Sequence, residues 1–525
     1  MDLIDKSVLV VDCYPEYRNS IKNTMSQLGS KVVHTVPNAD RAIEKVEEYD
    51  YDVIISEYAL GVGKNGQELI EELRHNFLIK PTTIFGVVSA ENTSWIIFGI
   101  VEQRPDFYLR KPFKNSDLIN RLEFSMERKK ELHSIEQALL SKEYESAIKY
   151  CDLSLLKKTK YPMDVLKLRA EALLGWEKYE DAARLYTKIL QKKSDLSWAL
   201  VGLGKAHFEL ENYHQSIGDF NAAINCPVVH LDAYDWLSKS YLILSSPKKA
   251  QSALEAAVRL SPKSILRLQR LCDLSLRNGD KDVAKKSLRN VIKEGKNSCF
   301  KRVDDSLNLA ILEFEKNPIM SFQVLNDSAK EFRNDNIPRL RIEIKKSVLL
   351  FEAKKKEDAQ KSLARAEAMY DALTEKNSLI LLEFSEAYLA FDFLTEANES
   401  VGKIVIDDLD NVSKNQYHKL IHKLKELPKF SYNTLNEKGV SLFKNGSVID
   451  AFDNFQQAAK GKPREVSYSL NAAQALIMLI KDKKVGIEKL KEASFYIKNC
   501  QDLIDRSDDN YARLLQLIKI HKTLG

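Results

Sequence analysis

The chain has 525 residues, which is too long for one ordinary domain and suggests about three. It is 44% hydrophobic and 30% charged, with only 18 glycines and 13 prolines, so it can bury a large core and is expected to be mostly helical. The net charge of +5 permits acidic partners without demanding nucleic acid.

The six cysteines are scattered through the chain without a CxxC spacing. We therefore expect neither a disulfide framework nor a zinc site, and free thiols favour a reducing cytoplasm. The N-terminus has acids before a short apolar run and no cleavage site, so no signal peptide is expected. No apolar run reaches about 18 residues, so no membrane span is expected, and we predict a cytoplasmic protein.

Residues 1–128 alternate short apolar runs with stretches of helical period. The expected strands are 7–12, 31–36, 52–57, 82–89 and 107–112. The first helical stretch places Tyr17, Ile21, Met25 and Leu28 on one face, a second begins at the N-cap residue Asn38, and a third groups Leu69, Ile70, Leu73 and Phe77. This alternation predicts a doubly wound α/β domain, with a five-stranded parallel sheet covered by helices on both faces.

In such a sheet, ligand sites lie beyond the carboxyl ends of the strands. The residues at these ends are Asp12 and Cys13, then Glu57, then Ser89, and finally Lys111 with Pro112. Acids, a hydroxyl and a lysine are therefore predicted to converge on one site.

The motifs VLVVDCYPEYR, DVIISEYALG, NGQELIEELR, VVSAEN and FYLRKPF occur in this order between residues 8 and 113. They resemble the receiver domain of bacterial two-component response regulators, over residues 6 to about 128. The resemblance implies a flavodoxin-like fold in which acids after the first and third strands hold magnesium and the third-strand aspartate is phosphorylated by a histidine kinase. It also implies that Ser89 and Lys111 contact the phosphoryl group, that Tyr108 is the switch residue, and that the peptide before Pro112 is cis.

Two positions depart from the family pattern. The phospho-acceptor position is Glu57, whose carboxylate lies roughly 1–1.5 Å further out than that of an aspartate. Cys13 replaces the second acid of the pair, and a thiol is a poor magnesium ligand. Because a displacement of about an ångström can cost around a hundredfold in rate, we expect no phosphorylation. No cofactor is expected either, with Asp12 and Glu57 the only positions left for magnesium.

A longer acid can instead pair directly with Lys111, with Ser89 supplying a hydrogen bond. Glu57 would then stand where a phosphoryl group lies and would hold the receiver in a constitutive signalling conformation. The alternative is a retired site that is kept only for folding, and the sequence leaves both open. Cys13 is expected to be a small, semi-buried residue and not a redox sensor.

From about residue 131 onward a 34-residue period replaces the strand pattern. Small residues recur at Ala182, Ser216, Ala250 and Ala284, with Ala170, Gly204, Ser238 and Cys272 twelve residues earlier and Tyr186, Phe220, Leu254 and Leu288 four later. Small residues let two antiparallel helices pack closely, and units that cannot bury their own faces stack. The period resembles the tetratricopeptide repeat (TPR) and predicts an all-α solenoid.

The TPR solenoid is expected over residues 129–500, with about nine to ten repeats in one or two arcs, followed by a capping helix over 501–525. The last receiver helix, residues 117–140, is expected to run into the first repeat without a linker. The segment 405–429 is expected to be irregular, and the cationic segment 266–289 is expected to be a solvated face.

These features predict a non-enzymatic signal-transduction adaptor or scaffold of a bacterial two-component phosphorelay, with a pseudo-receiver and a TPR region that binds other proteins. Self-association through the receiver is a further candidate interaction. A phosphorylation-controlled response regulator with the same TPR output is the alternative. An RNA-binding helical-repeat protein is a third possibility, but the excess positive charge is too small to favour nucleic acid.

Overall fold

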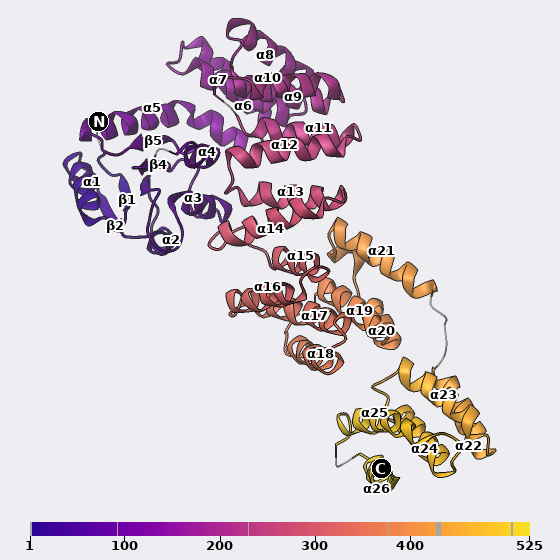
Figure 1. Cartoon of the computed structure of the whole chain (residues 1–525). Helices are drawn as coiled ribbons and strands as arrows, with labels where there is room; N and C mark the ends of the chain where they lie inside the picture. Colours follow the sequence, from indigo (N-terminus) through magenta and orange to yellow (C-terminus); the bar gives the residue numbers. More distant parts are fainter. Residues whose placement is uncertain are drawn as a thin grey trace. The chain divides into compact units, whose positions relative to one another are not determined.

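The computed structural model describes residues 3–91, 93–228, 230–375, 377–426, 432–505 and 508–524. The chain forms two compact units, Met1–Leu312 and Glu313–Gly525. The first unit begins with a five-stranded α/β domain and continues as stacked helix pairs, and the described part of the second unit is helical (Figure 1). Among the described residues, no helix is both long and apolar enough to cross a membrane.

The sheet is parallel throughout and its strand order is β2-β1-β3-β4-β5. Each strand lies within one of the five expected runs, so the predicted doubly wound fold is confirmed. The strand order switches between β1 and β3, because β2 is added on one side of β1 and the later strands on the other, and such sheets carry their sites at this switch point. The strands are β1 Ser7–Val11, β2 Val32–Val36, β3 Val53–Glu57, β4 Ile84–Ser89 and β5 Phe107–Arg110.

Five helices cover the two faces of the sheet. Alternate residues of each strand point to opposite faces, so Leu9 and Ile54 enter one core while Val8 and Val53 enter the other. The first core is closed by α2, α3 and α4, and the second by α1 and α5. The helices are α1 Pro15–Gln27, α2 Ala39–Glu48, α3 Gly66–His75, α4 Ser94–Glu102 and α5 Asn115–Leu140.

Local chemistry fixes where these helices begin. The Asn38 side chain accepts a hydrogen bond from the Arg41 backbone N–H, which confirms the expected N-cap of α2. Asn65 and Glu68 form a capping box at the start of α3. Phe77 was expected on the buried face of this helix, but α3 ends at His75 and the Phe77 side chain is 91% exposed.

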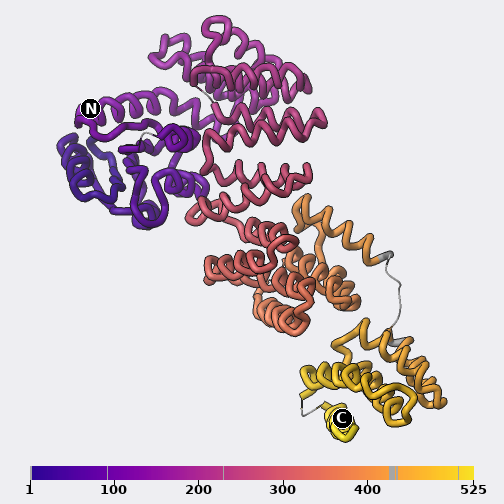
Figure 2. Tube along the Cα trace, in the orientation of Figure 1, coloured from indigo at the N-terminus to yellow at the C-terminus, as the bar shows by residue number. Residues whose placement is uncertain are grey.

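The last receiver helix continues into the repeats, as expected. α5 is a single helix of 26 residues, with Leu118 and Leu122 in the receiver core and Leu132 and Ile135 in the core of the first repeat. Helix pairs then follow in chain order (Figure 2). They are α6 Tyr144–Leu156, α7 Pro162–Gly175, α8 Tyr179–Lys192, α9 Ser197–Glu209, α10 Tyr213–Ile224, α11 Asp232–Ile243, α12 Pro247–Leu260, α13 Ile265–Arg277 and α14 Lys281–Glu294.

The small and large residues of the 34-residue pattern lie at the helix crossings. Ala182, Ser216, Ala250 and Ala284 are fully buried. A Cβ atom added at Gly204 would lie 2.6 Å from the Phe220 ring, which is closer than such contacts allow. Glycine therefore lets the aromatic side chain of one helix rest on the backbone of the other.

The turns inside the repeats carry the same period. Glu177, Glu211, Ser245 and Gly279 all have positive φ angles, of 60°, 61°, 51° and 77°. In the first of these turns, the Lys178 N–H donates to Leu173 O at 2.9 Å, and the Glu177 N–H donates to Leu174 O at 3.1 Å. This is the Schellman arrangement, which closes the end of a helix with one left-handed residue.

Helices continue through the described residues as far as Leu524. Two expectations were wrong: α21 occupies most of the segment expected to be irregular, and the last helix covers 511–524 instead of 501–525. Residues 427–429 of that segment lie outside the described residues. The helices are α15 Val303–Phe314, α16 Pro318–Glu331, α17 Asn336–Glu352, α18 Lys356–Asp371, α19 Ser378–Ala390, α20 Leu394–Gly402, α21 Asn411–Glu426, α22 Tyr432–Lys444, α23 Val448–Gly461, α24 Val466–Lys481, α25 Leu490–Gln501 and α26 Tyr511–Leu524, with short 3-10 turns at Ile406–Asp408 and Ile487–Lys489.

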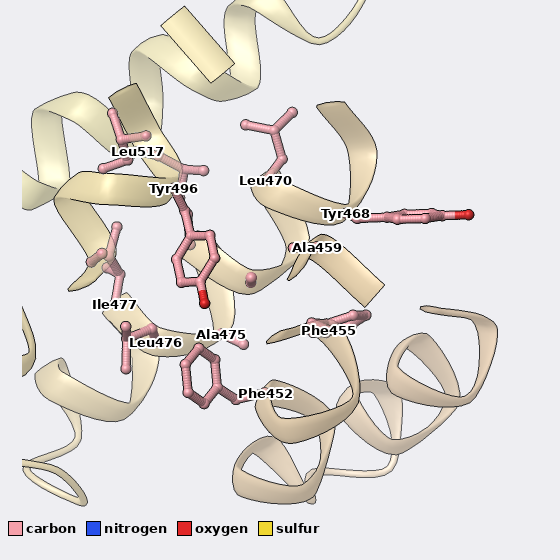
Figure 3. Packing of buried hydrophobic residues seen from close by; sticks show 14 of the residues in the cluster. Phe452, Phe455, Ala459, Tyr468, Leu470, Ala475, Leu476, Ile477, Tyr496 and Leu517 are labelled. Carbon is pink, nitrogen blue, oxygen red and sulfur yellow. The ribbon is translucent and has the colours of Figure 1, made fainter. Parts of the chain in front are cut away.

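The last repeats share one hydrophobic core. Phe452 and Phe455 of α23 pack with Leu476 of α24, Tyr496 of α25 and Leu517 of α26 (Figure 3). Burial of these large side chains is worth on the order of 1.5–3 kcal/mol each, so this core anchors α26 to the preceding pairs.

Candidate functional site

The candidate site lies at the carboxyl ends of β1, β3, β4 and β5. Val11 of β1 pairs with Ser56 of β3, so the next residues along, Asp12 and Glu57, lie side by side. Asp12 is 0% exposed and Glu57 is 3% exposed. Two carboxylates buried next to each other are unfavourable unless a positive charge lies between them.

Lys111 supplies that charge. Its ammonium group donates to Asp12 Oδ2 at 2.5 Å and forms an ion pair with Glu57 Oε2, and its side chain is only 4% exposed. The same nitrogen lies 4.0 Å from the centroid of the Tyr17 ring. Burial alone would lower the pKa of Lys111, but its hydrogen bonds to the two carboxylates outweigh burial and raise the pKa above its usual value. The direct pairing of Glu57 with Lys111 is therefore present.

The remaining carboxylate oxygens are also occupied. Glu57 Oε1 accepts hydrogen bonds from the backbone N–H groups of Tyr58, at 2.8 Å, and Ala59, at 3.2 Å. Asp12 Oδ1 accepts one from the Tyr14 N–H at 2.9 Å. These bonds fix the direction of both carboxylates toward Lys111.

Ser89 and Tyr108 lie beside the charged group without joining it. The Ser89 hydroxyl accepts a hydrogen bond from the Glu91 N–H at 3.1 Å, and the Tyr108 hydroxyl donates to Glu91 O at 2.8 Å. The expected hydrogen bond from Ser89 to Glu57 does not occur among the described residues. The peptide before Pro112 is cis, the isomer that the family resemblance implies.

The Cys13 side chain is partly exposed. Its Sγ donates to Ala59 O at 3.4 Å. Desolvation and the neighbouring Asp12 carboxylate raise the pKa of the Cys13 thiol, so the reactive thiolate is disfavoured.

The residues at this site do not fit a magnesium ion. Two carboxylates face the centre, but the Lys111 ammonium already bridges them. No cluster of three or more histidine, cysteine, aspartate or glutamate side chains with metal-binding geometry occurs among the described residues. Magnesium prefers an octahedral set of oxygen ligands, which this site does not provide.

A second group of charged residues joins the receiver to its own repeats within the first unit. The Arg267 Nη2 atom of α13 donates to Glu102 Oε1 of α4 at 2.6 Å and to Asp235 Oδ2 of α11 at 2.9 Å. The Ser261 hydroxyl donates to the other Glu102 oxygen at 2.7 Å. Arg267 is 4% exposed, so the expectation that the whole cationic segment is solvated was wrong at this residue.

Further contacts extend this interface between receiver and repeats. Arg104, just beyond α4, forms an ion pair with Asp232 of α11 at 3.4 Å, and the Lys263 ammonium lies 4.8 Å from the centroid of the Trp95 ring. This interface has no signal in the sequence, because Glu102 lies more than 150 residues from Arg267 and a buried arginine has no distinguishing sequence pattern.

The N-terminal region is similar to a family model and to solved structures. The response regulator receiver domain model matches residues 8–123. A beryllofluoride-activated DrrB receiver domain is 19% identical with a TM-score of 0.21, covering 24% of this chain and 99% of that structure. The Vibrio cholerae chemotaxis protein CheY4 is 23% identical with a TM-score of 0.22, covering 23% and 98%.

The helical region matches different structures. The TPR protein YrrB, described as having an unusual peptide-binding site, is 19% identical with a TM-score of 0.27, and the match covers 36% of this chain and 95% of YrrB. The MamA protein is 14% identical with a TM-score of 0.26, covering 31% and 88%. No curated protein sequence matches the chain. Residues 8–123 therefore belong to the response regulator receiver domain family, and they are followed by a helical region that matches TPR proteins.

Proposed function

We propose that this protein is a non-enzymatic signalling adaptor in which a receiver that does not accept phosphate is joined to a protein-binding TPR region. A single observation carries this proposal: Lys111 bridges Asp12 and Glu57 in a buried cluster. The lysine that would contact a phosphoryl group is already neutralised by the carboxylate in the acceptor position. The receiver is thereby held in one charge state without a metal or a phosphoryl group.

Two further observations support a fixed receiver that works through its repeats. The continuous helix α5 and the ion pairs of buried Arg267 with Glu102 and Asp235 link the receiver to the repeats at two separate places. Helical repeats of this kind present extended surfaces to other proteins and carry no chemistry of their own. In this account, partner proteins bind the repeats, and Glu57 sets the receiver conformation that the repeats hold.

The alternative of a phosphorylation-controlled regulator makes a different prediction for partner binding. The test is affinity capture from lysate with the tagged full-length chain, quantified by mass spectrometry with and without acetyl phosphate and magnesium. We expect the same partners at the same levels in both conditions, insensitive to nuclease treatment, and an altered set with Glu57→Gln. Partner levels that change with acetyl phosphate would support phosphorylation control, and partners lost on nuclease treatment would support RNA binding.

A further inference from the structure

The turn that joins α24 to α25 is longer than the turns inside eight other helix pairs (Figure 1). In those pairs, one residue with a positive φ angle follows the first helix, and the second helix begins two residues after it. After α24 the positive φ, of 54°, is at Lys483, but α25 begins only at Leu490, so this turn has five additional residues. Insertions in surface turns are places where repeat proteins commonly carry function. The residues with positive φ in the eight regular turns are Lys142, Glu177, Glu211, Ser245, Gly279, Lys354, Asp392 and Gly446.

The additional residues help to form an open hollow beside the end of α26. The hollow has a volume of about 560 Å³ and is lined by residues from the end of α24, from the long turn and from the end of α26. Ile487 belongs to the 3-10 turn within the insertion, and its side chain is 62% exposed. The lining residues are Ile480, Lys481, Lys483, Lys484, Val485, Gly486, Ile487 and Leu524.

The side chains that line the hollow are of two kinds. Lys481, Lys483 and Lys484 are cationic and exposed, and the others, apart from Gly486, are aliphatic. Within the described part of the chain, these three lysines form no ion pair, whereas Lys489, further along the turn, pairs with Glu492 at 2.7 Å. The positive charge at the hollow is therefore available to an anionic ligand.

This combination of side chains fits an anionic lipid better than it fits a peptide. A peptide backbone needs hydrogen-bond partners, and aliphatic side chains provide none, whereas an acyl chain needs none. Lysine side chains can lie along apolar surface while their ammonium groups reach lipid phosphates. The segment 481–489 has four lysines against Asp482 and Glu488, and an exposed aliphatic side chain among lysines is typical of segments that lie at the surface of an anionic bilayer.

We propose that the turn between α24 and α25 docks this protein on an anionic phospholipid surface. Lys483 and Lys484 pair with lipid phosphates, Ile487 enters the interfacial layer, and the hollow beside Leu524 takes part of one acyl chain. A single contact of this size is reversible, so the protein exchanges between the bilayer surface and solution. The proposal concerns a lipid surface and does not depend on protein binding by the repeats.

Co-sedimentation of the full-length chain with vesicles tests this proposal. The vesicles contain phosphatidylcholine alone or with about one third phosphatidylglycerol, in salt from about 0.05 to 0.5 M. We expect the chain to bind the anionic vesicles and not the neutral ones, and to bind less as salt rises, because salt screens the lysines. The double variant Lys483→Gln, Lys484→Gln should weaken binding about tenfold, and Ile487→Ser should weaken it about threefold.

A second basic turn supplies matched controls. Leu156 is 80% exposed and precedes the exposed Lys157 and Lys158, and the φ angle of Lys158 is 55°, close to that of Lys483. The double variant Lys157→Gln, Lys158→Gln and the single variant Leu156→Ser therefore remove comparable side chains from a turn outside the proposed site. Each should change vesicle binding by less than about twofold.

Each other outcome would overturn the proposal. Equal losses for the two lysine pairs would mean that general charge holds the vesicles, and unchanged binding of Ile487→Ser would mean that the aliphatic side chain does not enter the bilayer. Binding of soluble dihexanoyl phosphatidylglycerol without binding of vesicles would assign the hollow to a free amphiphile. Unchanged melting temperatures should show that all variants are folded, because every substituted side chain is exposed. Absence of vesicle binding would leave the proposed function untouched.

Discussion

Replacing Lys111 is the most informative perturbation of the receiver site. The buried group contains one positive and two negative charges, and Lys111 is the sole positive partner of Asp12 and Glu57 among the described residues. Lys111→Met keeps the length of the side chain, and much of its packing on Tyr17, but leaves two adjacent buried carboxylates unpaired. Breaking a buried pair in this way costs about 3–5 kcal/mol.

Glu57→Gln is the matched control. It leaves the Lys111–Asp12 pair intact, and the glutamine oxygen can still accept the two backbone hydrogen bonds that Glu57 Oε1 now accepts. The expected loss is about 1.5–3 kcal/mol, the usual range for one hydrogen bond to a charged group. Lys111→Met should therefore be less stable than Glu57→Gln by about 2 kcal/mol.

Urea denaturation, with hydrogen exchange measured on the peptide that contains β3, reports the stability of this region. The raised pKa of Lys111 means that its stabilising contribution is complete below its ordinary value of about 10.5 and is lost only as pH rises through the raised value. The wild-type contribution is therefore constant between pH 6 and 9. Equal losses of stability for the two variants would refute this reasoning.

Three other predictions follow from the packing. Burial raises the pKa of Glu71 to about 7, so protonation of this carboxyl stabilises the fold at low pH, and the stabilisation is lost as pH rises from about 4.5 to 7. Glu71→Gln should therefore raise the melting temperature at pH 8 but not at pH 4. Arg267→Met should destabilise the first unit by about 3–5 kcal/mol in urea denaturation and increase hydrogen exchange in α4, since it leaves Glu102 unpaired, and unchanged exchange would contradict the interface. Gly202→Ala should lower the free energy of unfolding, measured by calorimetry, by about 1–3 kcal/mol, because its Cβ would lie 2.2 Å from the Tyr186 ring. An unchanged free energy would mean that the ring moves freely.

Much of this architecture could be predicted because its signals are local. Apolar runs of six to eight residues predicted the strands, and the recurrence of small residues such as Ala182 and Ala250 predicted the repeat. The site residues could be placed because parallel strands bring their carboxyl ends to one edge, and the Glu57–Lys111 contact follows from that topology.

Other features could not be predicted because their causes are distant in sequence or carry no residue signature. Left-handed turn residues recur at Glu177, Glu211 and Ser245, and because none of these three is glycine, the residue type does not mark the turns in the sequence. The burial of Arg267 depends on Glu102, which belongs to another domain. The Ser89 hydroxyl is directed by its own loop toward the Glu91 backbone and so does not reach Glu57.

The direct test of the central claim is intact-mass measurement after incubation with acetyl phosphate and magnesium. The wild type should gain no phosphoryl group, because Lys111 already bridges Asp12 and Glu57. The double variant Glu57→Asp with Cys13→Asp restores the acids of the family pattern and should gain one. A phosphoryl group on Glu57 or Asp12 of the wild type would contradict the account.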